Sequence, residues 1–295
     1  MDWLDQYLHE LHRPGAVMHF PPDQQSWHAP VPSKQQLSLI QDATVADMMR
    51  MRMIQEARQM EMDAGMGGGY DAGSAARERP AAPSPLLNGL LAYWKLDQTL
   101  SDATVNGNNL SIELGADNYV PAIINDGFSF DGQTSLTPSS GPGALAFGTG
   151  DFSVSFWVYP TSAPNNNNVI IGWGIWPNTS GFVVQYTTGN FGFYLGGFAE
   201  FFGYSPPTMF NVWHHIVVVR TSGTANFYVN GINRGSANWN YDFTDGLWHI
   251  GRAQDVADYF LNGTLDEMGA WNRALSGAEI ISLYNAGAGK TYPFN

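Results

Sequence analysis

One stretch near the end of the chain decides the fold: Asn262-Gly-Thr-Leu-Asp-Glu-Met-Gly-Ala-Trp-Asn-Arg-Ala-Leu-Ser-Gly-Ala-Glu-Ile-Ile-Ser-Leu-Tyr284. Its first half alternates as a β-strand requires, because successive side chains of a strand point to opposite faces. One predicted face carries Leu265, Glu267, Gly269 and Trp271, and the other carries Asp266, Met268 and Ala270. The pattern predicts a strand in which Asp266 and Glu267 face opposite ways.

A short helix is predicted directly after this strand. Ser276 can cap its N-terminus, and Glu279 three residues later completes a capping box. Leu275 and Ile280 occupy the positions of a hydrophobic staple, and Gly287 stands where a C-terminal cap is wanted. The stretch therefore predicts one strand that runs into one closing helix.

The same stretch resembles the closing signature of the laminin-G-like, concanavalin A-like jelly-roll family, roughly G-x-I-D-E-x-R-I-x-N-R-A-L-S-x-x-E-I. The match runs from Gly263 to Ser276, and Glu279-Ile280 follows. Other segments resemble the same family in the same order: Leu91–Asp97, Asp102–Asn109, Phe128–Gly132, Asp151–Val158, Trp213–Val217 and Phe227–Gly231. The resemblance covers about residues 88–292. It implies that residues 86–295 form an all-β, two-sheet antiparallel sandwich with one short C-terminal helix.

Alternation along the chain indicates the same fold class independently. Short alternating runs are separated by glycine, asparagine and proline turns, as in a β-sandwich. The runs are Leu90–Leu96, Phe152–Tyr159, Phe182–Thr187, Phe191–Leu195, Trp213–Arg220, Asn226–Asn230, Leu247–Arg252 and Leu265–Trp271. Asn230-Gly231 suits a two-residue hairpin turn.

The first 85 residues differ in composition from the rest. Residues 1–64 are predicted to form an anchor arm with a methionine-rich helix over about 33–63, and methionine adapts to irregular protein surfaces. Residues 65–85 are rich in Gly, Ala and Pro, as linkers are. The arm would contact its partner through Trp3, Tyr7, Leu11, Phe20, Trp27, Leu37, Ile40, Met48 and Met51. The alternative is a solvated amphipathic helix without a specific partner.

Charge and cysteine content argue against several classes of function. The chain has 13 basic and 26 acidic side chains, a net charge of −13, so nucleic acid and anionic membranes are disfavoured as partners. Cysteine is absent, which excludes disulfides and thiolate metal sites. The first residues carry acids where a signal peptide carries bases, so we expect the chain to fold in a cytoplasm.

Catalysis is not predicted. A glycosidase needs two carboxylates across a sugar-binding cleft, and Asp266 and Glu267, if they face opposite ways, cannot form that pair. A polysaccharide-degrading enzyme of the same fold remains the alternative.

A single structural calcium ion is an open prediction. The resemblance implies one, since members of the family often carry it near the loop ends, and calcium takes oxygen ligands. The candidate ligands are Asp102, Asn106, Asn108, Asp131 and Asp266. In the alternative, Asp131-Gly132 is a turn, and Asp266 bonds the backbone or Arg273. The residues leave the two alternatives equal.

Aromatic side chains on loops are candidates for carbohydrate binding, because sugars stack on aromatic faces while polar groups bind their hydroxyls. The candidates are Trp173, Trp176, Tyr204, Trp239 and Tyr241, with Asn240 beside them. The alternative is that most of these rings fill the sandwich core.

Together these features predict a bacteriophage virion structural protein. Residues 1–64 would bind other virion proteins in a multi-copy or homo-oligomeric assembly. The jelly roll would face outward on the particle, where it binds a cell-surface glycan or decorates the capsid or tail. The alternative is a cellular adhesion or carbohydrate-binding module without catalysis.

Overall fold

The structure, a computed structural model, describes residues 83–141, 143–164, 167–173, 181–195, 200–238, 242–243, 248–253 and 259–294. All of them belong to one compact unit, Glu78–Asn295. The predicted anchor arm, with its contact residues from Trp3 to Met51, lies outside the described residues, as does the predicted linker up to residue 82. Among the described residues, no helix is long and apolar enough to span a membrane.

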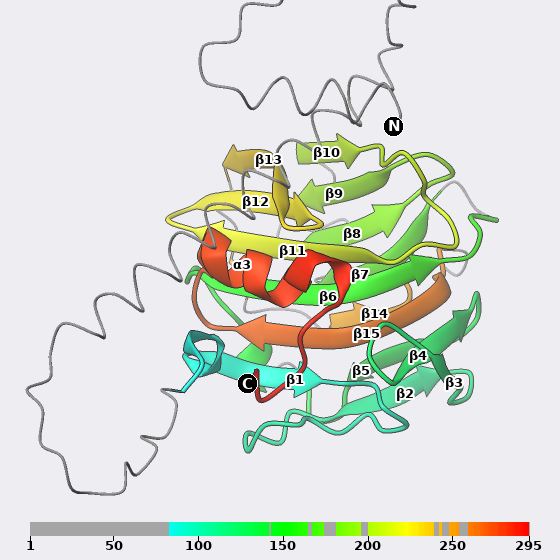
Figure 1. Cartoon of the computed structure of the whole chain (residues 1–295), viewed down its shortest axis with the longest axis horizontal. Coiled ribbons are helices and arrows are strands. Elements are labelled where there is room, and N and C mark those ends of the chain that lie inside the picture. Colours follow the sequence, from blue (N-terminus) through cyan, green and yellow to red (C-terminus); the bar gives the residue numbers. More distant parts are fainter. Residues whose placement is uncertain are drawn as a thin grey trace, which may run out of the picture. The chain divides into compact units, whose positions relative to one another are not determined.

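Two antiparallel sheets pack face to face in the described part of the chain (Figure 1). Sheet A runs in the order β13 (Ile232–Asn238), β12 (Thr224–Val229), β11 (His214–Thr221), β6 (Phe152–Pro160), β15 (Asn262–Trp271), β4 (Asp126–Asp131) and β3 (Tyr119–Pro121), with β1 (Leu90–Trp94) also paired to β15. Sheet B runs in the order β10 (Glu200–Tyr204), β9 (Phe191–Leu195), β8 (Phe182–Tyr186), β7 (Asn168–Trp173), β14 (Trp248–Ile250), β5 (Ser135–Pro138) and β2 (Leu110–Leu114). The predicted all-β, two-sheet antiparallel jelly-roll sandwich is confirmed.

Helical turns are few in the described residues. They are the 3₁₀ turns η2 (Pro85–Leu87), η3 (Gly143–Leu145) and η4 (Asn285–Gly287), and the α-helix α3 (Gly277–Tyr284). α3 lies over the outer face of sheet A, across β11 and β6 (Figure 1). Sheet A therefore has apolar neighbours on both faces, whereas an ordinary sandwich sheet buries only its inner face.

Alternation along β6 separates these two faces. Phe156 and Val158 point into the core between the sheets, while Trp157 and Tyr159 point outward. A second, smaller apolar cluster covers part of the outer face, formed by residues of β1, β11, β15, α3 and the C-terminal segment. Its buried members include Tyr93, Val217, Trp271, Ile280 and Phe294.

A β-bulge in β15 corrects the predicted alternation. Leu265 and Met268 both point into the core although they are three residues apart, because the register shifts between them and Glu267 adopts a positive φ of 49°. Asp266 is paired with the outward-pointing Trp157, and the Glu267 carboxyl lies near Tyr93 of the second cluster, so both buried acids point to the outer face. The prediction that they face opposite ways is wrong.

The predicted start of α3 is confirmed, and its predicted end is wrong. The Ser276 side chain accepts the backbone N–H of Glu279, and the Glu279 carboxylate accepts the backbone N–H of Ser276 at 2.8 Å. The C-cap is Asn285 in the left-handed conformation (φ 47°, ψ 49°), and Gly287 belongs to η4. Asparagine is among the few side chains that tolerate this conformation, so the helix ends there.

Arg273 ties the beginning of the described domain to its end. Its guanidinium donates to the carbonyl oxygens of Asn88 (2.7 Å) and Pro85 (2.9 Å) and pairs with the Glu279 carboxylate (3.0 Å). Leu86 between them is 1% exposed. The Arg273 guanidinium therefore connects three elements: η2, the segment that follows β15, and α3.

We predict that Arg273→Lys lowers the free energy of unfolding by about 2 kcal/mol, because an ammonium group cannot reproduce bonds in several fixed directions and a hydrogen bond to a charged group contributes ~1.5–3 kcal/mol. Urea denaturation measures this. Glu279→Gln is the matched control: it removes the ion pair but leaves the bonds to residues 85 and 88, so its loss should be smaller. If wild type and Arg273→Lys had equal free energies of unfolding, the hydrogen bonds of the Arg273 guanidinium would not stabilise the fold as proposed.

Candidate functional site: a groove on the outer face of sheet A

The outer face of sheet A is covered at one end and open at the other. Trp157 stacks on Tyr284 of α3 (ring centroids 5.7 Å apart), and Gly289 of the C-terminal segment lies beside Trp157 and Ile124. Tyr159, the next outward residue of β6, is only half-buried. The cover therefore stops between these two positions.

Four side chains from neighbouring strands form one row at the open end. Thr264 of β15 is paired in register with Ser129 of β4 on one side and with Tyr159 of β6 on the other. Trp213 precedes β11, whose first residue is paired with residue 158. Residues that are directly opposite on neighbouring strands point to the same face, so the row crosses the sheet.

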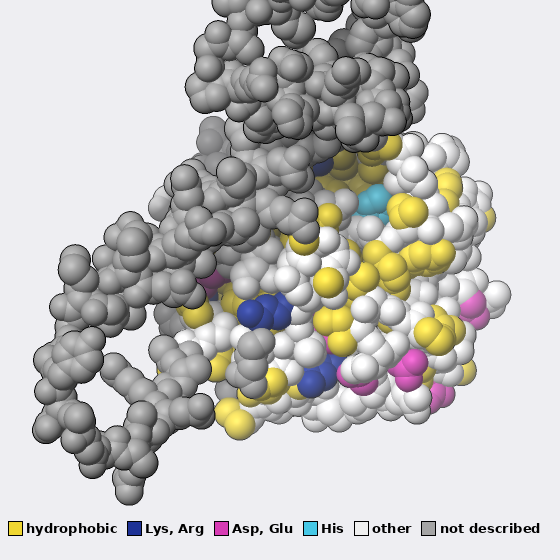
Figure 2. Space-filling model, viewed as in Figure 1, with side chains coloured by type: hydrophobic (Ala, Val, Ile, Leu, Met, Phe, Trp, Pro, Cys, Tyr) yellow, Lys and Arg dark blue, Asp and Glu magenta, His cyan; other side chains and the backbone are white. Residues whose placement is uncertain are grey.

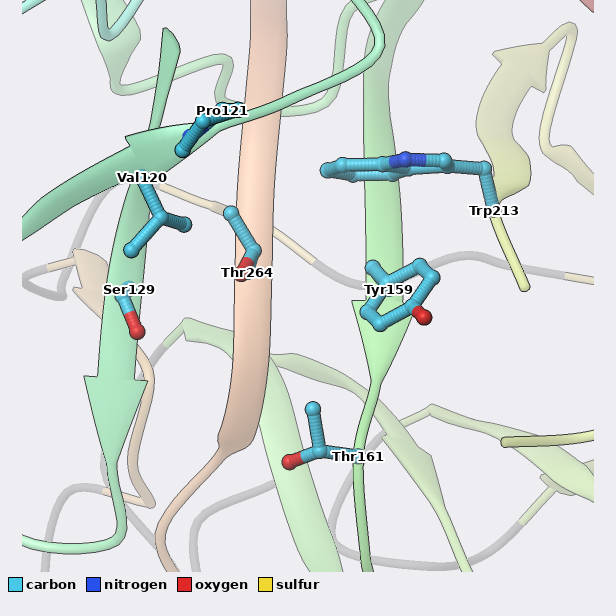
Figure 3. A pocket seen from close by; sticks show the side chains of 7 residues that line it. All are labelled: Val120, Pro121, Ser129, Tyr159, Thr161, Trp213 and Thr264. Carbon is cyan, nitrogen blue, oxygen red and sulfur yellow. The ribbon is translucent and has the colours of Figure 1, made fainter. Parts of the chain in front are cut away.

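This row lies in a groove of about 440 Å³ (Figure 3). The lining residues are Val120, Pro121, Ser129, Tyr159, Thr161, Trp213 and Thr264. Figure 3 shows Trp213 and Tyr159 side by side along one side, with Val120, Pro121 and Ser129 on the other and Thr264 between them. The rings of Tyr159 and Trp213 are 5.3 Å apart and inclined at 51°.

Local sequence explains the floor of the groove. Gly263 has a φ of 157°, and a Cβ at this position would clash with the carbonyl oxygen of Tyr159. Glycine therefore allows β15 to approach β6 closely, directly beside Thr264, which is 6% exposed.

The groove combines two kinds of surface. Tyr159 and Trp213 present aromatic rings, and Ser129, Thr161 and Thr264 present hydroxyl groups that can donate and accept hydrogen bonds. Apolar area with a few placed polar groups is the usual composition of a small-ligand site. On the right half of the face seen in Figure 2, the surface is mostly hydrophobic or uncharged, and acidic side chains lie at its lower right edge.

Of the aromatic residues predicted from the sequence, Tyr204 is the one whose side chain the structure describes, and it does not line this groove. Tyr204 is paired with the core residue Phe191 and packs at the edge of the core, with the Arg234 guanidinium 4.0 Å from its ring centroid. One face of the Tyr204 ring is thus covered. Trp173 ends β7, and its side chain lies outside the described part, as do Trp176, Trp239, Asn240 and Tyr241.

The sequence places Tyr159, Trp213 and Thr264 in predicted strands and Ser129 in a segment that resembles the family, and it gives Val120, Pro121 and Thr161 neither assignment. Their local signal is the alternation that turns Tyr159 away from the core while Val158 enters it. The pairing of Thr264 with Ser129 and Tyr159, which completes the row, has no local signal.

The predicted calcium ligands Asp102, Asn106 and Asn108 instead organise their own loop. The Asp102 carboxylate accepts N–H groups of Tyr93 (3.0 Å), Thr104 (2.9 Å) and Asn108 (2.9 Å). The Asn106 and Asn108 side chains donate to carbonyl oxygens of β1. Hydrogen-bond donors thus occupy the Asp102 carboxylate oxygens that a cation would need.

The remaining two candidates lie apart from each other. Asp131 accepts the backbone N–H of Gln133 and the hydroxyl of Thr134, both at 2.9 Å, which is the turn given as the alternative. Asp131 is paired with Asn262, four residues from Asp266 and so about 13 Å away at 3.3 Å per residue. Among the described residues, no group of three or more His, Cys, Asp or Glu side chains could hold a metal ion. The calcium ion stays a prediction, and these positions do not converge on one.

Asp266 and Glu267 form a buried acidic pair next to the groove. They are 0% and 2% exposed, and Asp266 accepts the backbone N–H of Ile124 at 3.0 Å. Desolvation by burial is the main reason that the pKa of Asp266 is raised to about 9 and that of Glu267 to about 7, and the charge of Glu267 raises the pKa of Asp266 further. Neither carboxyl group is open to a substrate in the groove.

These shifts predict that the fold loses stability as the pH rises. The folded pKa values lie above the ~3.9 and ~4.3 of an unfolded chain, so the folded state keeps protons that the unfolded state has lost. The contribution of the pair is greatest below about pH 4 and falls as the pH rises through 7 and 9. Urea midpoints at pH 5, 7 and 9 should show this decline.

The double variant Asp266→Asn, Glu267→Gln keeps the shape of both side chains and removes their titration. Its urea midpoint should change less between pH 5 and 9 than that of the wild type. If the urea midpoints of the two proteins changed equally with pH, Asp266 and Glu267 would not be the cause of the pH dependence.

Comparison with known proteins places the chain among lectin-like jelly rolls. The family model of the concanavalin A-like lectin/glucanases superfamily matches residues 125–281. A comparison with curated proteins finds no match.

Solved structures share the fold. Domain 4 of AbnA, a GH43 extracellular arabinanase from Geobacillus stearothermophilus, in complex with arabinotriose, is 20% identical with a TM-score of 0.55, over 65% of this chain and 96% of that one. The binding domain of Paraclostridial Mosquitocidal Protein 1 is 16% identical (TM-score 0.53, 68% of this chain and 52% of that one). The binding domain of botulinum neurotoxin serotype G is 21% identical (TM-score 0.53, 67% and 51%). The chain thus spans about half the length of the two toxin domains.

Proposed function

Because the chain belongs to the concanavalin A-like lectin/glucanases superfamily, we propose that its jelly-roll domain binds carbohydrate, without cleaving it, in the groove on the outer face of sheet A. The observation that carries this proposal is the open row of Ser129, Thr264, Tyr159 and Trp213. Elsewhere on this face, α3 covers the aromatic side chain of Trp157. The aromatic pair in the groove, Tyr159 and Trp213, is not covered by α3.

The groove offers what a sugar needs. The C–H face of a pyranose or furanose ring is apolar and can stack on Tyr159 or Trp213, while its hydroxyls can bond Thr264 and Ser129. A structural neighbour with the same fold, domain 4 of AbnA, is in complex with arabinotriose, which supports a sugar as the ligand.

Binding without cleavage follows from the placement of the acids. Hydrolysis of a glycosidic bond uses two carboxyl groups about 5–10 Å apart on either side of it. The described lining of the groove contributes hydroxyl and apolar side chains, and the adjacent Asp266 and Glu267 are buried beneath neighbouring segments. We therefore favour a binding domain over a polysaccharide-degrading enzyme.

We predict that Trp213→Ala weakens glycan binding at least about tenfold, because burying a large apolar side chain contributes ~1.5–3 kcal/mol and ~1.4 kcal/mol is a factor of ten. An array of immobilised oligosaccharides that includes arabinotriose identifies a ligand, and titration calorimetry then compares the variants.

Tyr204→Ala is the matched control, since Tyr204 is the described aromatic residue that the sequence alone favoured. It should leave the affinity unchanged once its fold is verified by a urea midpoint. Loss of binding in Tyr204→Ala with full binding in Trp213→Ala would move the site to the edge of sheet B.

The wider role predicted from the sequence, a bacteriophage virion protein that displays this domain, depends on residues 1–64. They lie outside the described residues, so this role stays a prediction. Its support is the composition of residues 1–64, since a proline-rich, polar sequence of this kind is not expected to form an apolar core of its own.

Limited proteolysis of the full chain tests the anchor. We expect residues 1–85 to be shed early and a resistant core to begin at about Leu86, because Leu86 is buried and Arg273 binds the carbonyl of Pro85. Mass spectrometry identifies the new terminus. An arm as resistant as the core would indicate that it packs on its own domain, which would remove the main support for docking on a particle.

A further inference from the structure

Building on the proposed function, we infer that the groove takes an uncharged oligosaccharide that lies across the strands of sheet A, and that it discriminates against glycans with carboxylate groups. The first part follows from the geometry of the row, and the second from where the charged side chains lie.

The row defines the direction of the ligand. Ser129, Thr264 and Tyr159 are in register on three neighbouring strands, which lie ~4.8 Å apart, close to the length of one sugar unit. The Trp213 ring lies 5.3 Å from that of Tyr159, on the same side of the groove (Figure 3). Successive sugars along this line would each meet a hydroxyl or a ring.

Extension along the strands is blocked on one side. The next outward positions, about 6.6 Å away at 3.3 Å per residue, are Trp157 on β6 and Asp266 on β15. Trp157 lies under Tyr284, and Asp266 is fully buried beside Ile124. A ligand longer than one unit cannot extend past this side, but it can lie across the sheet, between the Tyr159 and Trp213 pair on one side and the β3 residues on the other (Figure 3).

The described lining offers no cation for an acidic sugar. A carboxylate is bound most effectively by the paired donors of an arginine. Each arginine of the described domain is engaged elsewhere: Arg220 with the carbonyl of Gly148, Arg234 over Tyr204, Arg252 with Glu113, and Arg273 with Glu279. The two described lysines, Lys95 and Lys290, are not lining residues of the groove. The hydroxyls of the groove can bind neutral sugars but cannot balance a negative charge.

A fixed negative charge lies at the rim. Asp131 follows Ser129 by two residues on β4 and points to the same face, about 6.6 Å away. Burial raises the pKa of its carboxyl, but hydrogen bonds from Gln133 and Thr134 outweigh this and hold the pKa below its ordinary value. Asp131 is thus ionised at neutral pH and would repel an anionic glycan.

Matched glycans test the charge selectivity. For each neutral oligosaccharide that binds on the array, titration compares it with the oligouronate of the same linkage and length, using wild type, Trp213→Ala and Asp131→Asn. We expect the oligouronate to bind the wild type at least about tenfold more weakly, and Asp131→Asn to narrow that gap. Trp213→Ala should lose the neutral ligand.

The outcomes separate this inference from the proposed function. An oligouronate that binds equally or more tightly, with binding lost in Trp213→Ala, overturns the inference and leaves the groove as the site. Glycan binding that is unaffected in Trp213→Ala overturns the proposed function itself.

Ligand length tests the direction. Ser129→Ala and Trp213→Ala change opposite ends of the row. The affinity for a monosaccharide should fall in Trp213→Ala only, whereas the affinity for a trisaccharide should fall in both variants. If Ser129→Ala left the affinity for the trisaccharide unchanged, the ligand would not lie across the sheet.

Discussion

Packing of α3 and the C-terminal segment on the outer face of sheet A is the interaction on which the rest of the structure depends. It lets β15 bury side chains on both faces, with Leu265 and Met268 in the sandwich core and Trp271 beneath the outer cover. Because this cover ends at the contact of Trp157 with Tyr284, the row that includes Tyr159 stays open. The place where α3 and the C-terminal segment stop covering sheet A therefore determines both the buried outer cluster and the position of the groove.

The same cover explains the buried acids. The bulge at Glu267 leaves this carboxyl group and that of Asp266 outside the apolar core, under segments that supply few hydrogen-bond donors. The pKa of a carboxyl group in such surroundings is raised, because burial penalises the charged form. The pair thus makes part of the stability dependent on pH, next to a groove whose own lining residues are hydroxyl and apolar.

Much of the fold could be predicted from the sequence, and the candidate site could not. The capping box of Ser276 and Glu279 is a local pattern, so it appears in the sequence as it does in the structure. The bulge at Glu267 breaks the alternation without a local mark, so the two acids were placed on opposite faces. The sequence favours loop aromatic residues such as Tyr204 for carbohydrate binding, but in the structure Tyr204 packs against the core and Arg234. The groove depends on register between strands that are 100 or more residues apart, as in the pairing of Thr264 with Tyr159 and Ser129, and no local pattern contains that information.

The most direct test of the account is the indole N–H signal of Trp213 in a two-dimensional ¹H–¹⁵N spectrum of the full chain, assigned with Trp213→Phe, during titration with a glycan that binds on the array. The account predicts a saturable shift of this signal, while the signals of the buried Trp94, Trp248 and Trp271 stay in place. A saturating ligand that shifts other indole signals and leaves that of Trp213 unchanged would contradict it.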